Sequence, residues 1–258
     1  ESFSPQDYFC GDKDFLTEVD VTVNIAAKPF SFDAPANNWF LSSLLDDTSF
    51  DGAVEAEKTG QDINALYPAE LNRAYHQEER VQQLYQLMYQ PAQTPIAIVG
   101  PNGVGKHTIV QEAVWRYESG YYEKVKSRHQ RLWHIDPTRL IAGMSIVGMW
   151  QKRLEAIIEF IMRPSEKKGD SDKMLVDNPI ALLRIGKSAQ NDMTLSDVLR
   201  PYLEKRQLHL ILIATPEEWK TLQEKGRRFS NLFRVVRREE PGLEKAVQII
   251  IEKRRQLE

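Results

Sequence analysis

The chain has 258 residues, and its hydrophobic content of 41% is enough for one substantial α/β core with an appendage. Lysine and arginine total 34 against 37 aspartates and glutamates, and this net charge of −3 gives no overall attraction to nucleic acid or anionic membranes. No apolar run reaches the roughly 20 residues that span a bilayer, no secretory signal pattern is present, and the single cysteine, Cys10, favours a reducing, cytoplasmic location.

The first 65 residues differ in pattern from the rest. Val19–Ile25 alternates apolar and polar residues as a strand does, and Leu44–Gly60 is acidic, but neither stretch carries recognisable chemistry. The chain starts at Glu1 without a methionine and stops at Glu258 inside a charged, helix-like segment. We therefore predict a fragment or a processed piece of a longer protein.

After this segment, strands and helices alternate. Apolar runs predict four strands, and helical spacing of apolar residues predicts the segments between and after them. The predicted strands are Ile96–Val99, Arg131–Ile135, Met174–Val176 and Leu208–Ala214, and the predicted helices are Pro68–Tyr89, Thr108–Arg116, Met149–Met162, Leu195–Lys205 and one from Glu217. This alternation predicts a mostly parallel sheet with helices on both faces.

A glycine-rich loop lies between the first of these strands and its helix. The loop consists of Gly100, Pro101, Asn102, Gly103, Val104, Gly105 and Lys106, which fits the G-x-x-x-x-G-K pattern of a P-loop. Its glycines allow backbone N–H groups to surround phosphates, Lys106 can reach the β and γ oxygens, and the helix dipole adds positive potential. We therefore predict a site for ATP or ADP.

The residue after the lysine departs from this pattern. A serine or threonine hydroxyl coordinates Mg²⁺ at that position, and here it is His107, with Thr108 one step later. Imidazole is a poor ligand for Mg²⁺, which prefers oxygen. Nucleotide binding is therefore expected, whereas tight magnesium-dependent catalysis is not. Thr108 could contact a phosphate or, after a local shift, substitute as the magnesium ligand.

Several separated segments resemble the first ATPase module of Clp-type AAA+ protein unfoldases. Leu140-Ile141-Ala142-Gly143, followed by Gly148 to Leu154, is similar to L-I-A-G-x-x-x-x-G-E-F-E-x-R-L in that family. Met193 to His209 resembles the segment N-x-L-K-P-x-L-A-R-G-E-L-H, and Glu240-Pro241 falls where the family has D-E-P. The resemblance covers about residues 70–258.

The resemblance implies a P-loop NTPase (AAA+) fold of class α/β, with a parallel sheet flanked by helices. It divides the chain into an N-terminal segment of unknown role, 1–65, a large α/β subdomain, 66–239, and the start of a helical lid, 240–258. Proteins of this family form rings and thread protein substrates using ATP. Protein partners and a homo- or hetero-oligomeric AAA+ ring are therefore implied here, and neither a membrane nor nucleic acid.

The resemblance also implies that the residues of hydrolysis are altered. The family's Walker B strand ends in Asp-Glu, and here Asp177 is followed by Asn178, whose amide cannot accept a proton from water. Asp177 keeps its implied role near magnesium. The polar sensor falls on Ala214, with Thr215 beside it.

Two further motifs of the family are changed. Its paired arginines fall on Asn231 and Leu232, although the nearby Arg227, Arg228 and Arg234 could substitute after a shift in register. The pore loop that grips substrate reads Ser145, Ile146 and Val147, without the family's aromatic residue.

Together these changes predict an AAA+ module that binds nucleotide, hydrolyses it weakly or not at all, and acts as a structural or regulatory ring subunit in protein remodelling. One alternative is an active unfoldase driven by a second ATPase module. Another is an adaptor that docks a partner through residues 1–65 and uses the AAA+ module for assembly.

Other polar residues are interpreted as packing or surface residues. Trp133, His134 and His209 lie at strand ends without metal-ligand spacing. Arg227 and Arg228 with Arg237 and Arg238 could form a basic patch that contacts nucleic acid or an acidic partner.

Overall fold

A computed structural model describes residues 50–122, 130–142, 149–163, 171–187 and 192–255. The sheet lies in a compact unit that spans residues 49–258. Its strands are β1 (Gly60–Asp62), β2 (Ile96–Val99), β3 (Leu132–Ile135), β4 (Lys173–Val176), β5 (His209–Ala214) and β6 (Arg234–Arg237). Its helices are α3 (Gly52–Thr59), the 3₁₀ turn η2 (Asn64–Leu66), α4 (Glu78–Tyr89), α5 (Lys106–Glu118), α6 (Met149–Met162), α7 (Pro179–Arg184), α8 (Leu195–Glu204), α9 (Pro216–Lys225), α10 (Arg227–Ser230) and α11 (Leu243–Arg255).

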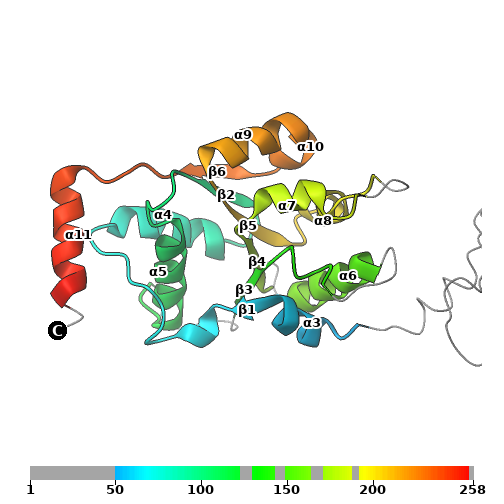
Figure 1. Cartoon of the computed structure of the whole chain (residues 1–258). Helices are drawn as coiled ribbons and strands as arrows, with labels where there is room; N and C mark the ends of the chain where they lie inside the picture. The colour runs from blue at the N-terminus through cyan, green and yellow to red at the C-terminus, as the bar shows by residue number, and fades with distance from the viewer. Residues whose placement is uncertain (1–49, 123–129, 143–148, 164–170, 188–191, 256–258) are drawn as a thin grey trace, which may run out of the picture. The chain divides into compact units, whose positions relative to one another are not determined.

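The six strands form one sheet in the order β1-β3-β4-β5-β2-β6 (Figure 1). All neighbouring strands are parallel except β1 and β3, which are antiparallel. The predicted mostly parallel α/β sheet is therefore confirmed. Because parallel strands share a direction, the segments that follow β2, β4 and β5 all leave the sheet at its carboxyl edge, which is where ligands bind in open α/β sheets.

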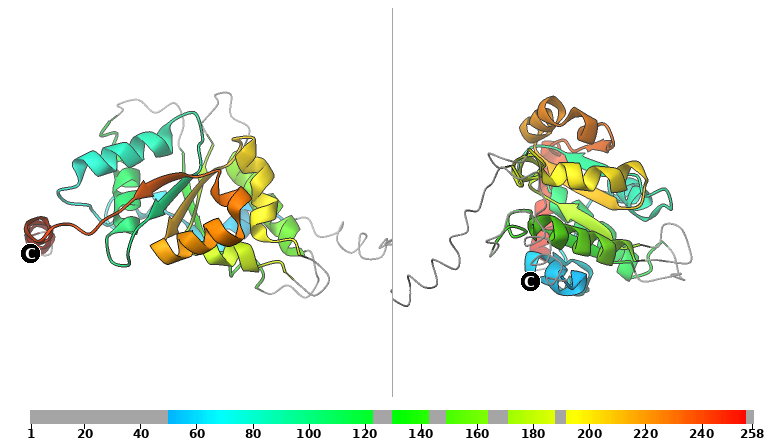
Figure 2. Two further views of the ribbon diagram at one scale, coloured as in Figure 1. Left: turned by 90° about the horizontal axis from the view of Figure 1, so that it is seen from above. Right: turned by 90° about the vertical axis from the view of Figure 1, so that its right-hand side faces the viewer.

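Helices cover both faces of the sheet (Figure 2). Alternate strand side chains such as Ile98 and Ile211 pack under α4 and α5, whereas Val99 and Leu212 pack under helices α6 to α9. Because both faces are covered, β2, β4 and β5 are buried along their whole lengths. This explains why they read as continuous apolar runs in the sequence.

The start of the α/β unit differs from the predicted boundary. Residues 52–62, which were grouped with the segment 1–65, form α3 and β1. Helix α3 packs against α6, and β1 pairs with β3 from Gly60 opposite Ile135 to Asp62 opposite Trp133. The α/β unit therefore begins before residue 66.

The predicted helix Pro68–Tyr89 is too long at its N-terminus. Helix α4 begins only at Glu78, and residues 68–77 form turns and irregular backbone. His76 has a φ of 55°, in the left-handed region, so a continuous helix cannot pass through it. Leu71 is nevertheless buried, so its apolar character reflects packing rather than helical periodicity.

Among the described residues, none of the helices is both long and apolar enough to cross a membrane. The predicted pore loop, Ser145, Ile146 and Val147, lies outside the described residues, as does Cys10.

Candidate functional site

The glycine loop has the backbone of a phosphate cradle. Gly103 and Gly105 have φ values of 82° and 80°, which favour glycine, and α5 begins immediately afterwards at Lys106. The Lys106 Nζ donates hydrogen bonds of 2.7 Å to the carbonyl oxygens of both Gly100 and Pro101. Burial lowers the pKa of Lys106, and the nearby Glu218 carboxylate partly opposes this shift.

A cavity of about 400 Å³ joins this loop to the carboxyl edge of the sheet. It is lined by Asn102, Gly103, Gly105, Lys106, His107, Thr108, Asp177, Ile213, Ala214, Thr215 and Glu218. The structure thus brings Asn102, Gly103, Gly105 and Lys106 of the predicted P-loop together with Asp177 and with Ala214, the predicted sensor position at the end of β5. We call this space the phosphate cavity.

Two histidines contact Asp177 in this cavity region. The Nε2 of His107 lies 3.3 Å from Asp177 Oδ2, in a hydrogen bond. The Nε2 of His134, from the neighbouring strand β3, lies 3.1 Å from the same oxygen, without the geometry of a hydrogen bond. The interactions with His107 and then His134 hold the pKa of Asp177 well below its usual range. His134 was interpreted as a packing residue, so that interpretation missed its place beside Asp177.

The resemblance in sequence predicts Asn178 at the position of a water-activating glutamate, and its side chain hydrogen-bonds to the backbone. Its Oδ1 accepts a hydrogen bond of 3.2 Å from the backbone N–H of Ala181, and Asn178 is the N-cap of α7. An amide used in this way caps a helix and has no basic group to offer water.

We expect Asn178→Ala to lower the free energy of unfolding by about 1 kcal/mol, because the capping acceptor is lost. Asn178→Asp keeps an acceptor at the cap and is expected to retain the stability of the parent chain. Urea denaturation of both variants checks this, and equal losses in the two would contradict the capping role.

Thr215, next to the predicted sensor position Ala214, also caps a helix. Thr215 Oγ1 accepts a hydrogen bond of 3.2 Å from the backbone N–H of Glu218, and the backbone N–H of Thr215 donates one of 2.7 Å to Glu218 Oε2. This reciprocal capping box begins α9. Glu218, a second carboxylate that lines the phosphate cavity, is therefore hydrogen-bonded to the backbone at the start of α9.

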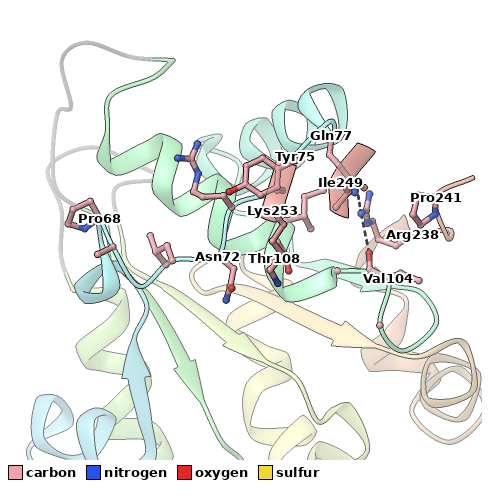
Figure 3. A pocket seen from close by; sticks show the side chains of 17 residues that line it. Pro68, Asn72, Tyr75, Gln77, Val104, Thr108, Arg238, Pro241, Ile249 and Lys253 are labelled. Carbon is pink, nitrogen blue, oxygen red and sulfur yellow. Dashed lines mark hydrogen bonds between the residues drawn. The ribbon is translucent and has the colours of Figure 1, made fainter. Parts of the chain in front are cut away.

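A second cavity, of about 640 Å³, lies against the other side of the glycine loop (Figure 3). It shares Gly103, Gly105 and Thr108 with the phosphate cavity. Its remaining lining includes Leu71, Asn72, Arg73, Ala74, Tyr75, Gln77, Val104, Ile109, Arg238, Pro241, Ile249 and Lys253. A mixed apolar and amide lining beside a phosphate cradle suits the base and ribose of a nucleotide.

Arg238 is a residue of this second cavity that the sequence interpretation placed in a surface patch. It is only 4% exposed, and its Nη2 donates to Gln77 Oε1 at 2.7 Å and to the Val104 carbonyl oxygen at 3.4 Å (Figure 3). Burial lowers the pKa of Arg238 to about 10, with a further contribution from Arg80. Arg238 therefore links β6, the start of α4 and the glycine loop.

The altered arginine positions lie away from the phosphate cavity of the same chain. Asn231 and Leu232 follow α10, and Arg227 and Arg228 are exposed and line a separate cavity of about 450 Å³ between α7, α8, α9 and α10. Arg234 is exposed on β6. None of these side chains lines the phosphate cavity in the described part of the chain.

No family model matches the chain. The chaperone protein ClpB of Malacoplasma penetrans is 23% identical over 203 residues, which cover 75% of this chain and 27% of that protein. Heat shock protein 104 of Schizosaccharomyces pombe is 22% identical over 259 residues, which cover 97% of this chain and 27% of that protein.

Solved structures agree on the fold. Hsp104 with ATPγS and FITC casein, in its closed state, superposes with a TM-score of 0.65 at 21% identity, covering 76% of this chain and 32% of that one. The Saccharomyces cerevisiae Hsp104 complex with ADP gives 0.62 at 20% identity, covering 76% of this chain and 26% of that one. The chain thus spans about a quarter of the length of the curated relatives it matches.

Proposed function

Because this chain is a member of the Clp-type AAA+ family, we propose that it binds ATP or ADP at residues 100–108. In this proposal it hydrolyses ATP weakly or not at all and serves as a structural or regulatory subunit of a protein-remodelling ring. Nucleotide binding is supported by the glycine loop, by the buried Lys106 and by the two cavities that adjoin the loop. We further propose that residues 240–258 begin the lid and that the protein is cytoplasmic.

The observation that carries weak hydrolysis is the capping role of Asn178. A water molecule that attacks the γ-phosphate needs a group that orients it and takes its proton. Asn178 Oδ1 accepts a hydrogen bond from the backbone N–H of Ala181, and Glu218 Oε2 accepts one from the backbone N–H of Thr215. Neither carboxylate that lines the phosphate cavity, Asp177 or Glu218, is free of a protein partner.

Removal of the Lys106 ammonium tests nucleotide binding. At an ADP concentration about 100 times Kd, ADP is expected to stabilise the parent chain by about 2.7 kcal/mol. Lys106→Ala is expected to lose most of this stabilisation because the cation facing the phosphates is gone, whereas Lys220→Ala, at an exposed position of α9, keeps it. Thermal melts with and without ADP measure the difference.

A steady-state ATPase assay on the same proteins tests weak hydrolysis. We expect the parent chain to release phosphate no faster than the Lys106→Ala variant. Magnesium-dependent turnover that Lys106→Ala abolishes would contradict the proposal and favour an active motor.

Ring assembly is tested separately by the mass of the protein with and without ADP in solution. Ring formation is a proposal, because the chain spans only about a quarter of the length of the relatives named above. Protein that stays monomeric with ADP present would contradict it.

A further inference from the structure

The position that magnesium takes in hydrolysing P-loop proteins is surrounded here by a different set of side chains. His107 stands at the residue where those proteins have a hydroxyl ligand, in the first turn of α5. Its Nε2 contacts Asp177 Oδ2 at 3.3 Å, and His134 Nε2 approaches the same oxygen to 3.1 Å. The two imidazole rings are 6.3 Å apart between their centres, so Asp177 lies between two histidines.

Residues from three separate elements build this cluster. His107 comes from α5, His134 from β3, and Asp177 directly follows β4. Strands β3 and β4 are paired, with His134 opposite Leu175, so the sheet register fixes His134 beside the end of β4. The His107 and Asp177 side chains are 50% and 34% exposed and both line the phosphate cavity, whereas His134 does not line it and its Nε2 is buried.

These residues do not fit Mg²⁺. This ion requires near-octahedral oxygen ligands at about 2.0–2.1 Å and keeps its waters. The hydroxyl ligand is replaced by an imidazole, and the Asp177 oxygen nearest to it is already contacted by two ring nitrogens. Thr108 lies one residue further along α5, about 100° around the helix axis from position 107. Among the described residues, no group of three or more His, Cys, Asp or Glu side chains is arranged to hold a metal ion.

The same residues can serve a phosphate chain without a metal. A carboxylate beside the phosphates would repel them unless a cation or hydrogen-bond donors intervened. The Nε2 of His107 is within hydrogen-bond distance of Asp177 Oδ2 and the Nε2 of His134 lies against the same oxygen, so the two rings cover that carboxylate oxygen, and Lys106 with the N-terminus of α5 supplies the positive potential. We propose that this cavity binds nucleoside diphosphate without magnesium, with His107 and His134 taking the place of the ion. This inference rests on the nucleotide binding proposed above.

Calorimetric titration of ADP into the full chain, in excess MgCl₂ or in EDTA, tests the proposal. For the parent chain we expect Kd values in the two buffers to agree within about twofold. The double variant His107→Thr/His134→Ser restores a hydroxyl after Lys106 and releases Asp177, so its Kd is expected to be about tenfold lower in magnesium than in EDTA. His76→Asn removes an exposed histidine that lines neither cavity and should behave as the parent chain.

The outcomes separate this inference from the proposed function. ADP that binds the parent chain about tenfold more weakly in EDTA would overturn metal-independent binding and leave nucleotide binding intact. A double variant that remains folded and binds equally well in both buffers would overturn the assignment of His107 and His134. If ADP binds in neither the MgCl₂ buffer nor the EDTA buffer, both the proposed function and this inference are overturned.

Discussion

Replacing Glu112 by alanine is expected to lower the free energy of unfolding by about 3–5 kcal/mol, because it leaves a buried guanidinium without its counter-ion. Glu112 is 1% exposed in α5. Its Oε2 lies 2.7 Å from Arg73 Nε and its Oε1 lies 2.8 Å from Arg116 Nε. The backbone N–H of Ala74 donates a third hydrogen bond, of 3.1 Å, to Oε2. Burial raises the pKa of Glu112, but the hydrogen bonds from Arg73 and Arg116 outweigh it and the net shift is downward.

This substitution should also affect the second cavity. Arg73 and Ala74 line that cavity, and Arg73 stacks at 3.4 Å over the ring of Trp115 from the same helix as Glu112. Glu112 therefore fastens residues 72–74 to the helix that follows the P-loop. Loss of this attachment is expected to weaken ADP binding as well as stability.

Chemical denaturation and ADP titration of Glu112→Ala measure the two effects. Glu57→Ala, at an exposed position of α3, is the matched control and should change stability by no more than about 0.5 kcal/mol. A Glu112→Ala loss as small as that of the control would show that the cluster does not hold this part of the fold.

Below about pH 6.5, the chain is expected to lose stability through His209, and His209→Gln should remove that part of the loss. His209 is 1% exposed at the start of β5. Burial, reinforced by the positive charges of Lys173 and Arg206, lowers the pKa of His209 from 6.5 to about 3. Between these two values the unfolded chain binds a proton that the folded chain does not, so stability falls as pH falls.

The expected slope is about 1.4 kcal/mol per pH unit, or about 2 kcal/mol between neutral pH and pH 5. Stability is measured by urea denaturation at several pH values, with each protein referred to its own value near neutral pH. The parent chain and His209→Gln should diverge as the pH is lowered from about 6.5 toward 4.5. Parallel curves for the two proteins would contradict the prediction.

Local patterns in the sequence were sufficient for much of the fold. Strands β2, β4 and β5 are covered on both faces, so each is an apolar run, apart from Lys173 and His209 at the starts of β4 and β5, and can be recognised without knowing its neighbours. The P-loop was equally visible, because the glycines that adopt positive φ and the lysine that follows them are fixed by adjacent positions in the chain.

The edges of the sheet could not be predicted in the same way. β1 consists of Gly60, Gln61 and Asp62, and β6 has arginine at both ends and is largely exposed. Neither shows an apolar pattern, because each pairs on one side only, and its backbone hydrogen bonds to β3 or β2 define it. Strand pairing of this kind depends on the partner rather than on local periodicity.

The sequence by itself determined the phosphate loop, the aspartate at the end of β4 and the parallel order of strand and helix. Only the tertiary structure decided how the side chains around Asp177 are used. His134 and Asp177 are far apart in the sequence and meet because β3 and β4 pair in one register. Asn178 is seen to cap α7 only once the backbone turns there. Motifs record residue identity and spacing along the chain, whereas the hydrogen bonds and electrostatics of this site depend on distances across the sheet.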